Sequence, residues 1–331
     1  MLRVYAIVPV APFEPESIIT KSIESLKELG CDDFDLKIYY VIDTFHGDER
    51  KLHWSLPDNF TIMLRTPRGR KAGAINDVLS VIKNENADYI AIIDVDWKPA
   101  KDFITKCIAA LEKDDSAVHA TAGCRFGVNK SNTLTKIISN NLSFFTCDVY
   151  RHLTRPSGFT ATNIGVVKRS FLDGEKFDEM TSAEDLDFFH RICLKGKVAV
   201  LADTAIGEHA PTTLKELYHQ RVRWYKGCVE SVSKYFIPMV KAPIPFAKKM
   251  SWFSQGMLFF CGFLLTPLVI SQFISHFDKI KKQSSTSVEL VKIFCGSLCI
   301  WPFMTICGLV AIVKHLTLCE FEWKPTTRID A

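Results

Sequence analysis

The stretch Tyr89–Trp97 constrains the fold of this chain most, because an apolar run ends there abruptly in two aspartates. The run predicts a strand that is buried on both faces, with Asp94 and Asp96 at its carboxyl end. In open α/β sheets, ligands bind at such strand ends. Two carboxylates there suit a divalent cation that is shared with substrate phosphates. An acidic loop that caps the next helix would explain the same pair of aspartates. The neighbouring segments are therefore needed to distinguish a metal site from a helix cap.

Strand and helix patterns alternate before this stretch. Short apolar runs predict strands at 4–8, 37–42 and 60–64, and helical spacing predicts a helix at 17–29 and a second one that extends to about Lys83. This alternation predicts a mostly parallel sheet with right-handed crossovers. The carboxyl ends of parallel strands share one rim, so Asp43, which follows the second strand, is expected near Asp94.

A basic, glycine-containing turn covers residues 66–76 and leads into a helix. Cations beside a helix N-terminus favour an anion, because unpaired backbone N–H groups and the helix dipole add to the side-chain charge. We therefore expect Lys71 to reach a diphosphate. A solvated basic loop is the alternative interpretation.

A second acidic cluster occupies residues 182–187 at the start of a predicted helix. Ser182 fits an N-cap with Asp185 in the first turn, which is a structural interpretation. The functional interpretation makes Asp185 a general base, because a carboxylate at a helix N-terminus stays ionised and accepts a proton from a nearby hydroxyl.

On the helix that follows Thr213, the residues Gln220, Arg223 and Trp224 are spaced i, i+3 and i+4 and share one face. An amide, a guanidinium and an indole form an unusual stripe, because a buried arginine needs an anion. We expect an anionic ligand or a carboxylate opposite this face.

Together these residues carry a resemblance to a known family. The order and rough spacing of Asp43, Asp94-Val-Asp96, Glu184-Asp185 and Gln220-Arg-Val-Arg-Trp224 resemble family 2 glycosyltransferases. The similar members are membrane-bound, D,D,D,QxxRW-type enzymes such as cellulose, chitin and hyaluronan synthases and ceramide glucosyltransferase. The resemblance implies an α/β fold of the GT-A, Rossmann-like type over residues 1–230. Thr44 and Ala183 depart from the family pattern, which has a second acid and a threonine there.

The resemblance also implies roles for the individual residues. By this resemblance, Asp185 is the catalytic base and Asp96 binds the metal, which is Mg²⁺ or Mn²⁺. The residues expected to bind the nucleotide-sugar, taken as a UDP-sugar, are Asp43, Lys71, Asp94, Glu184, Gln220, Arg223 and Trp224. The metal and the cations stabilise a leaving diphosphate while Asp185 deprotonates the attacking hydroxyl. The expected reaction is therefore a direct displacement with inversion.

Two long uncharged runs close the chain, at 252–277 and 293–313. Each exceeds the roughly 20 residues that cross a hydrocarbon core of about 30 Å. We expect a transmembrane helical hairpin within residues 251–331, preceded by an interfacial, amphipathic linker at 231–250. Two buried core helices are the alternative. From the resemblance, the protein is expected to be an integral membrane protein whose catalytic domain faces the cytosol, where nucleotide-sugars are found.

The net charge and the cysteine content limit the kinds of partner that we expect for this chain. The net charge is only +4, with no basic face of the kind that binds nucleic acid. The 11 cysteines form no CxxC pair and no zinc-ligand spacing, so the thiols are expected to be reduced. The expected partners are therefore a nucleotide-sugar donor, a lipid or saccharide acceptor, and the membrane.

The predicted function is a single or limited sugar transfer to a lipid-linked or glycolipid acceptor, because one hairpin cannot enclose a polymer channel. Three alternatives stay open at this point. They are a processive polysaccharide synthase that acts as a homo-oligomer, a polyprenyl-phosphate sugar synthase, and a non-catalytic membrane scaffold with a sugar-nucleotide fold.

Overall fold

The structure is a computed structural model that describes residues 1–29, 33–45, 56–150, 164–260 and 262–317. The chain divides into two compact units. The first unit is Met1–Gly123 with Gly158–Ile206, and the second is Cys124–Ser157 with Gly207–Ala331. The domain boundaries expected at residues 230 and 250 stay predictions.

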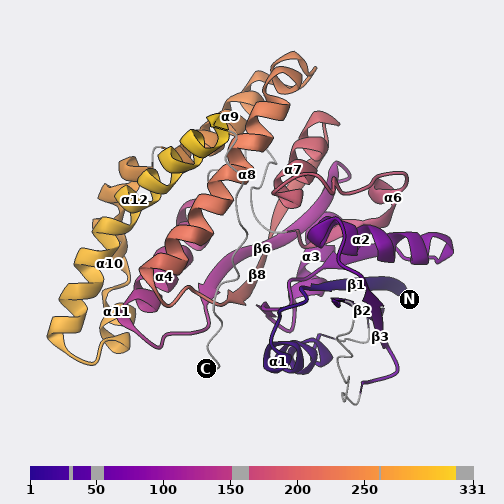
Figure 1. Cartoon of the computed structure of the whole chain (residues 1–331), viewed down its shortest axis with the longest axis horizontal. Helices are drawn as coiled ribbons and strands as arrows, with labels where there is room; N and C mark the ends of the chain where they lie inside the picture. The colour runs from indigo at the N-terminus through magenta and orange to yellow at the C-terminus, as the bar shows by residue number, and fades with distance from the viewer. Residues whose placement is uncertain (30–32, 46–55, 151–163, 261, 318–331) are drawn as a thin grey trace. The chain divides into compact units, whose positions relative to one another are not determined.

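The described strands form one mixed sheet of eight strands in the order β3-β2-β1-β4-β7-β6-β8-β5. Figure 1 labels β1, β2, β3, β6 and β8 of this sheet. The eight strands are β1 (Leu2–Val10), β2 (Phe34–Asp43), β3 (Phe60–Arg65), β4 (Tyr89–Ile92), β5 (Lys98–Pro99), β6 (Ala117–Gly127), β7 (Val166–Lys168) and β8 (Val198–Glu208). The pairs β1–β2, β2–β3 and β1–β4 are parallel, as predicted, whereas β7 is antiparallel to both β4 and β6.

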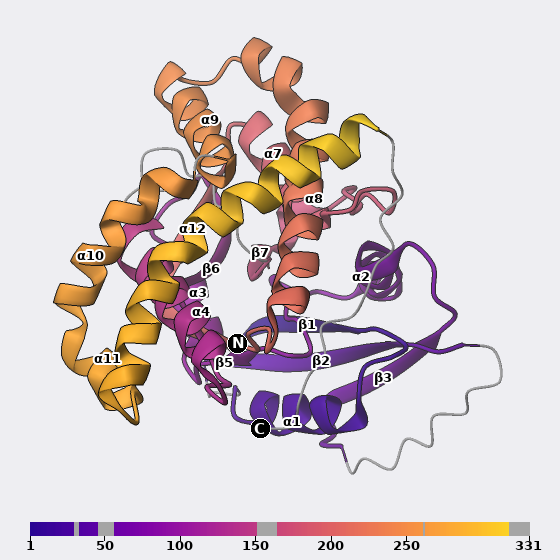
Figure 2. The same ribbon diagram turned by 60° about the vertical axis from the view of Figure 1, so that its left-hand side comes forward.

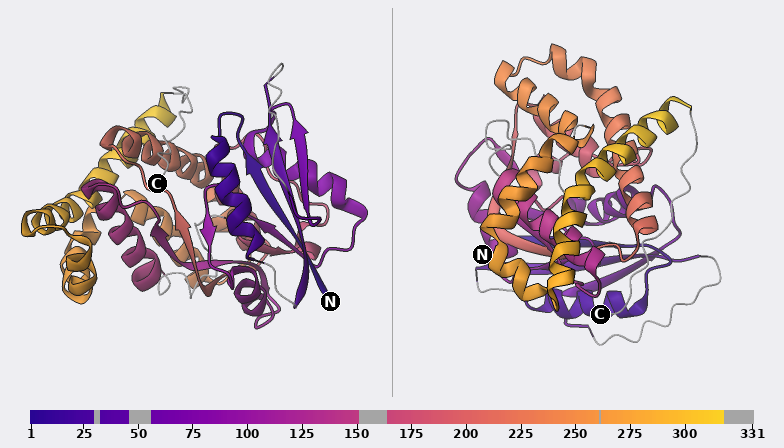
Figure 3. Two further views of the ribbon diagram at one scale, coloured as in Figure 1. Left: turned by 90° about the horizontal axis from the view of Figure 1, so that it is seen from below. Right: turned by 90° about the vertical axis from the view of Figure 1, so that its left-hand side faces the viewer.

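The predicted buried strands are confirmed at the centre of this sheet. On β1, Val4 and Ile7 point to opposite faces and both are fully buried, and Ile90 and Ala91 of β4 are fully buried as well. A strand needs helices on both faces for such burial. Figure 3 shows α1 (Glu16–Lys27) and α2 (Arg70–Val81) on opposite faces of these strands.

The other helices of the first unit are η1 (Ile82–Asn84), α3 (Phe103–Leu111), α6 (Arg169–Leu172) and α7 (Glu184–Leu194). The sheet and helix packing places the carboxyl ends of β2 and β4 and the beginnings of α2 and α7 within this one unit. These are the positions that carry the first six predicted site residues.

The second unit is mainly helical (Figure 2). Its elements are α4 (Thr133–Phe144), the π-helix η2 (Phe145–Tyr150), α8 (Leu214–Lys241), α9 (Phe246–Phe260), η3 (Gly262–Leu265), α10 (Thr266–Ser275), α11 (Phe277–Gln283) and α12 (Ser287–Leu316). Of the described helices, α12 alone is long and apolar enough to cross a membrane.

The first predicted membrane span, 252–277, is therefore wrong as one continuous helix. The run divides among α9, η3 and α10, and Pro267 lies at the start of α10. Proline has no backbone N–H and cannot continue a helix without breaking its hydrogen bonds. Thr305 of α12 fixes the interruption, because its hydroxyl oxygen accepts a hydrogen bond from the Phe263 backbone N–H at 3.1 Å. The second predicted span is one unbroken helix.

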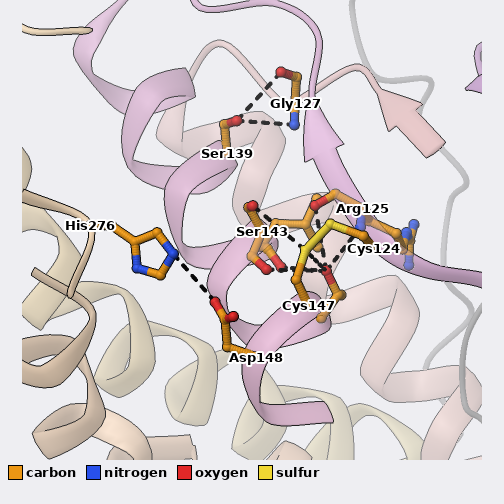
Figure 4. Close-up of a disulfide and its surroundings, with 10 residues drawn as sticks. Cys124, Arg125, Gly127, Ser139, Ser143, Cys147, Asp148 and His276 are labelled. Carbon is orange, nitrogen blue, oxygen red and sulfur yellow. Dashed lines mark hydrogen bonds and ion pairs between the residues drawn. A yellow bond between two sulfur atoms is a disulfide. The ribbon is translucent and has the colours of Figure 1, made fainter. Parts of the chain in front are cut away.

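The expectation of reduced thiols is also wrong for one pair. Cys124 and Cys147 form a disulfide that joins β6 to η2 (Figure 4). Close to it, the Thr146 hydroxyl accepts a hydrogen bond from the Arg125 backbone N–H at 3.0 Å. The two cysteines are 23 residues apart, so only the fold brings them together.

Candidate active site

The turn before α2 directs Lys71 toward the carboxyl end of the sheet. Gly69 has a φ of 60°, and a Cβ atom there would overlap the carboxylate of Glu179. The positive φ favours a glycine here, whereas the Glu179 side chain could move to make room for a Cβ atom. Arg70 follows with a φ of 53°, an uncommon value for a residue with a side chain. The helix begins at once, and Lys71 is its second residue.

Lys71 lies between two predicted acidic site residues. Its ammonium nitrogen is 2.6 Å from Asp94 Oδ1 and 3.1 Å from Glu184 Oε1. Burial opposes the charge of Lys71, but the carboxylates of Asp94, Glu184 and Asp185 outweigh it and raise the pKa of Lys71. The structure thus brings together residues from α2, the end of β4 and the start of α7.

Asp185 is a half-buried carboxyl group beside this cluster. Burial and the neighbouring Glu184 carboxylate raise the pKa of Asp185 to about 7, against the opposing effect of Lys71. The Leu186 backbone N–H donates a hydrogen bond to Asp185 Oδ1 at 2.8 Å. A carboxyl group with a pKa near neutrality is well suited to accept and release a proton.

The capping interpretation of the second acidic cluster is wrong. Helix α7 begins at Glu184, its N-cap is Ala183, and no side chain caps it. Ser182 therefore lies outside the cap position, and Asp185 is the second residue of the helix. The Asp185 carboxylate therefore lies beside the cluster that contains Lys71 and does not form part of a helix cap.

The chemistry of these acids fits a divalent cation held jointly with a diphosphate. The described residues contain no group of three or more His, Cys, Asp or Glu side chains able to hold a metal by themselves. Mg²⁺ and Mn²⁺ in phosphate sites usually need only one or two carboxylates, with phosphate oxygens and water as the other ligands. Asp94 and Asp96 flank a tight turn in which the Trp97 N–H donates to the Asp94 carbonyl at 2.9 Å. Because Lys71 occupies one Asp94 oxygen, Asp96 stays the predicted ligand.

Asp43 is buried at the end of β2 and is paired with an arginine that the sequence analysis missed. Arg65 lies directly opposite Asp43 in the parallel register of β2 and β3, with Arg65 Nε 2.5 Å from Asp43 Oδ1. Burial raises the pKa of Asp43, and the guanidinium opposes that rise. The sequence does show an arginine at the end of one predicted strand and an aspartate at the end of another. Recognising the two as a pair requires knowing that these strands are neighbours in the sheet.

The same guanidinium also holds the turn that carries Lys71. Arg65 Nη1 donates to Asp77 Oδ2 at 2.7 Å, and Nη2 donates to the carbonyls of Arg68 at 2.5 Å and Arg70 at 3.1 Å. These bonds join the end of β3 to the turn before α2 and to α2 itself. Arg65 thereby connects the Asp43 carboxylate to the backbone that positions Lys71.

The three predicted residues of the Gln-x-x-Arg-Trp segment lie on α8 in the second unit, and all three are half-buried. The buried arginine of this segment is Arg221, which the sequence analysis did not single out. Its guanidinium carbon lies 4.1 Å from the centre of the Trp224 ring, and burial lowers the pKa of Arg221. Arg221 therefore orients the Trp224 indole. The joint action of these residues with Asp94 and Asp185 stays a prediction.

The sequence model of the family described as "Glycosyl transferase family group 2" matches residues 89–313. "Probable glucomannan 4-beta-mannosyltransferase 3" of Oryza sativa subsp. japonica is 29% identical over 210 residues, which cover 62% of this chain and 37% of that protein. "Glucomannan 4-beta-mannosyltransferase 2" of Arabidopsis thaliana is 24% identical over 272 residues, which cover 80% of this chain and 50% of that protein. The chain thus spans half or less of the length of these two relatives.

The chain also resembles solved structures, including the following two. The mannosyltransferase PcManGT from Pyrobaculum calidifontis, in complex with GDP-Man and Mn²⁺, matches with a TM-score of 0.63 at 16% identity, over 96% of this chain and 88% of that one. TarS from S. aureus matches with a TM-score of 0.50 at 16% identity, over 99% of this chain and 57% of that one. At these identities the likeness concerns the fold, and the predicted α/β fold of the GT-A type is confirmed.

Proposed function

The chain belongs to glycosyl transferase family group 2, and on this premise we propose that it transfers a sugar from a nucleotide-sugar to a hydroxyl acceptor by direct displacement with inversion. The observation that carries the proposal is the cluster of Lys71, Asp94, Glu184 and Asp185. It combines a cation for a leaving diphosphate with a carboxyl group whose pKa suits a general base.

Each residue of the cluster has a separate task in this reaction. Asp185 takes the proton of the attacking hydroxyl, which leaves the acceptor oxygen free to displace the diphosphate. Lys71 neutralises the charge that develops on the diphosphate, and Asp94 and Glu184 hold the ammonium in place. Mg²⁺ or Mn²⁺, when bound at Asp96, supplies further positive charge for the leaving group. No covalent sugar–enzyme bond is needed.

We extend the D,D,D,QxxRW assignment to the remaining predicted residues. Asp43, oriented by Arg65, contacts the nucleotide base, and Gln220, Arg223 and Trp224 bind the diphosphate and the acceptor. A UDP-sugar was expected from the resemblance. The names of the relatives and the GDP-Man bound to PcManGT favour GDP-mannose as a second donor to test.

For the acceptor, we infer a lipid-linked or glycolipid hydroxyl at the cytosolic face of a membrane, reached through the apolar helices of the second unit. The processive synthase is the alternative, and long polymer made by the purified protein would favour it. The Cys124–Cys147 disulfide is unusual for a cytosolic protein. The redox state of this pair in cells therefore tests the proposed placement directly.

The deciding experiment measures nucleotide release from UDP-sugars and GDP-mannose, with Mn²⁺ or Mg²⁺ and membrane lipid, followed by mass analysis of the lipid extract. Asp185→Asn should lower the turnover number by about 10²–10⁴-fold, the usual contribution of a general base. Asp173→Asn is the matched control, because this exposed carboxylate of the same unit pairs with Arg169 and is not part of the cluster. Wild-type protein as inert as Asp185→Asn with every donor would instead support the non-catalytic scaffold.

A further inference from the structure

The segment 173–183 lies between α6 and α7 and belongs to no helix or strand, although it leads directly into the helix that carries Glu184 and Asp185. Among these described residues Phe177 alone is buried, with 2% of its surface exposed. The backbone N–H and C=O of Phe177 are therefore shielded from water. They need hydrogen-bond partners from elsewhere in the protein.

Asn76 of α2 supplies both of these partners. Its Oδ1 accepts a hydrogen bond from the Phe177 N–H, and its Nδ2 donates one to the Phe177 carbonyl, each at 2.9 Å. Nδ2 also donates to Glu179 Oε1 at 2.9 Å. Both donors and the oxygen of the amide are thus in use, and the backbone of Phe177 fixes which way the amide faces. Asn76 itself is only 7% exposed.

The residue type at position 76 is not explained by α2 alone. Asparagine is a weaker helix former than alanine, because its short amide competes for backbone hydrogen bonds. Asn76 nevertheless lies in the interior of α2, five residues after Lys71. Its side chain bonds to a distant segment instead of to α2. The contact with Phe177 therefore accounts for an asparagine at this position.

Phe177 continues the connection into α7. Its ring stacks on the ring of Phe188, with centroids 4.9 Å apart and an angle of 27° between the rings. Phe188 is fully buried and lies three residues after Asp185, which is about one turn of the helix. The contacts Asn76–Phe177–Phe188 thus join α2 to α7 through two backbone hydrogen bonds and a pair of packed rings.

The ion pairs of Lys71 are unsuited to hold the two helices together during the proposed reaction. The Lys71 ammonium contacts Asp94 and Glu184 at 2.6 Å and 3.1 Å, but a bound diphosphate attracts the same group. A lysine side chain is also flexible, so its ammonium follows a shift of either helix. The Asn76–Phe177 bonds involve no group that contacts the donor, so they persist while Lys71 exchanges partners.

We propose that Asn76 is a positioning residue for sugar transfer, which fixes the beginning of α2 with Lys71 relative to the beginning of α7 with Asp185. The catalytic meaning of this role rests on the proposed function, whereas the connection between the helices rests on the contacts alone. A misplacement of about 1 Å far from the reacting atoms costs up to about 10²-fold in rate.

Asn129 of the second unit provides a matched control. Its amide makes the same pair of bonds to the backbone of one residue, because the Ala210 N–H donates to Asn129 Oδ1 at 2.7 Å and Nδ2 donates to the Ala210 carbonyl at 2.8 Å. Asn129 is 6% exposed, so the two asparagines are equally buried. Asn76→Ala and Asn129→Ala should therefore lower the denaturant midpoint of unfolding by similar amounts.

The readout that distinguishes them is the pKa of Asp185. It is measured by NMR on the full chain with ¹³C-labelled aspartate carboxyls, and the signal is assigned by its absence in Asp185→Asn. Burial and the carboxylates of Glu184 and Asp94 raise this pKa to about 7, whereas the Lys71 ammonium and a backbone hydrogen bond oppose the rise.

The expected shift has a defined direction. Without its amide at position 76, α2 no longer holds Lys71 against the acids, so Asn76→Ala should raise the pKa of Asp185 by about 0.5 or more. The same variant should lower kcat/KM by about tenfold or more. Asn129→Ala should leave the pKa of Asp185 unchanged.

Two further variants complete the test. Phe177→Leu stays apolar but loses the stacking on Phe188, so it should move the pKa of Asp185 in the same direction by less, and it replaces Asn76→Ala if that variant does not fold. Glu179→Gln keeps an oxygen acceptor for the amide and removes an exposed charge, so the pKa of Asp185 should stay the same.

Two outcomes separate this inference from the proposed function. An unchanged or lower pKa of Asp185 in both Asn76→Ala and Phe177→Leu, with a loss of stability like that of Asn129→Ala, would refute the positioning role. The titration needs no donor. A raised pKa in a protein that transfers no sugar would therefore support the connection between α2 and α7 and count against the proposed function instead.

Discussion

Replacement of Arg65 by methionine tests whether one buried guanidinium organises the donor site. Only 6% of the Arg65 side chain is exposed, and its two carboxylate partners, Asp43 and Asp77, are 10% and 18% exposed. Loss of one member of a buried ion pair costs about 3–5 kcal/mol, because the remaining charges stay buried without a partner. Two bonds to backbone carbonyls are lost as well. We expect the free energy of unfolding to fall by about 3–5 kcal/mol and the melting temperature by roughly 10 °C.

Arg68→Met provides the matched control. The Arg68 side chain is 71% exposed and pairs with the same Asp77, so its loss should cost about 1 kcal/mol or less. Denaturant and thermal unfolding of the two variants are compared with wild type. Equal and small losses for both would show that Arg65 does not hold this network.

Arg65→Lys separates an effect on donor binding from a loss of stability. A lysine keeps the charge but lacks the planar fork that reaches two carboxylates and two carbonyls at once. The turn before Lys71 is then less well fixed, so the KM for the donor should rise by about tenfold while the turnover number changes less.

The pH dependence of the Arg65→Met defect has a defined sign. Burial raises the pKa of Asp43 and Arg65 opposes that rise, so removal of Arg65 raises the folded-state pKa of Asp43 further. A carboxyl group with a raised folded-state pKa destabilises the protein as the pH rises above its unfolded pKa. The stability difference between Arg65→Met and wild type should therefore shrink as the pH falls from 8 to 5.

The remaining predictions concern the cluster, the metal and the disulfide. The transfer rate should fall below a pH of about 7 as Asp185 takes up its proton, and a rate that is flat between pH 5 and 8 would contradict its role as the base. Lys71→Met should lower kcat/KM by about 10²–10³-fold and move the acid limb of the pH profile to higher pH, because Lys71 opposes the raised pKa of Asp185. EDTA should abolish transfer and Mn²⁺ should restore it, and Asp96→Asn should raise the Mn²⁺ concentration required for half activity. Reduction of Cys124–Cys147 should lower the free energy of unfolding by about 3 kcal/mol for a loop of this length, measured by denaturant titration with and without reductant, and an unchanged midpoint would exclude that contribution.

The fold and the cluster in the first unit were largely predictable from sequence. The strands around Tyr89–Trp97, the basic turn before α2 and the beginning of α7 all follow from local patterns of apolar, glycine and acidic residues. The rule that parallel strands share a carboxyl rim predicted that Asp43 and Asp94 lie along one edge of the sheet. The contact of 2.6 Å between Lys71 and Asp94 was not itself predicted and comes from the fold.

The residues that were missed depend on contacts between distant segments. Arg65 follows an ordinary strand, and its importance comes from the register that puts it opposite Asp43. Arg221 is buried because α8 packs on α12, although Arg223 was the arginine that the spacing had emphasised. Neither the pairing of Arg65 with Asp43 nor the burial of Arg221 produces a repeating pattern in the sequence.

The sequence by itself determined the alternation of strands and helices, the positions of the acids at their ends and the apolar character of the C-terminal region, because these are local properties of a chain with fixed backbone periods. Only the tertiary structure decided that Cys124 meets Cys147 and that the run 252–277 is interrupted at η3, just before Pro267. It also showed that α12 packs on α4 and α8, because the contacts between distant helices are not encoded in the local pattern of apolar residues.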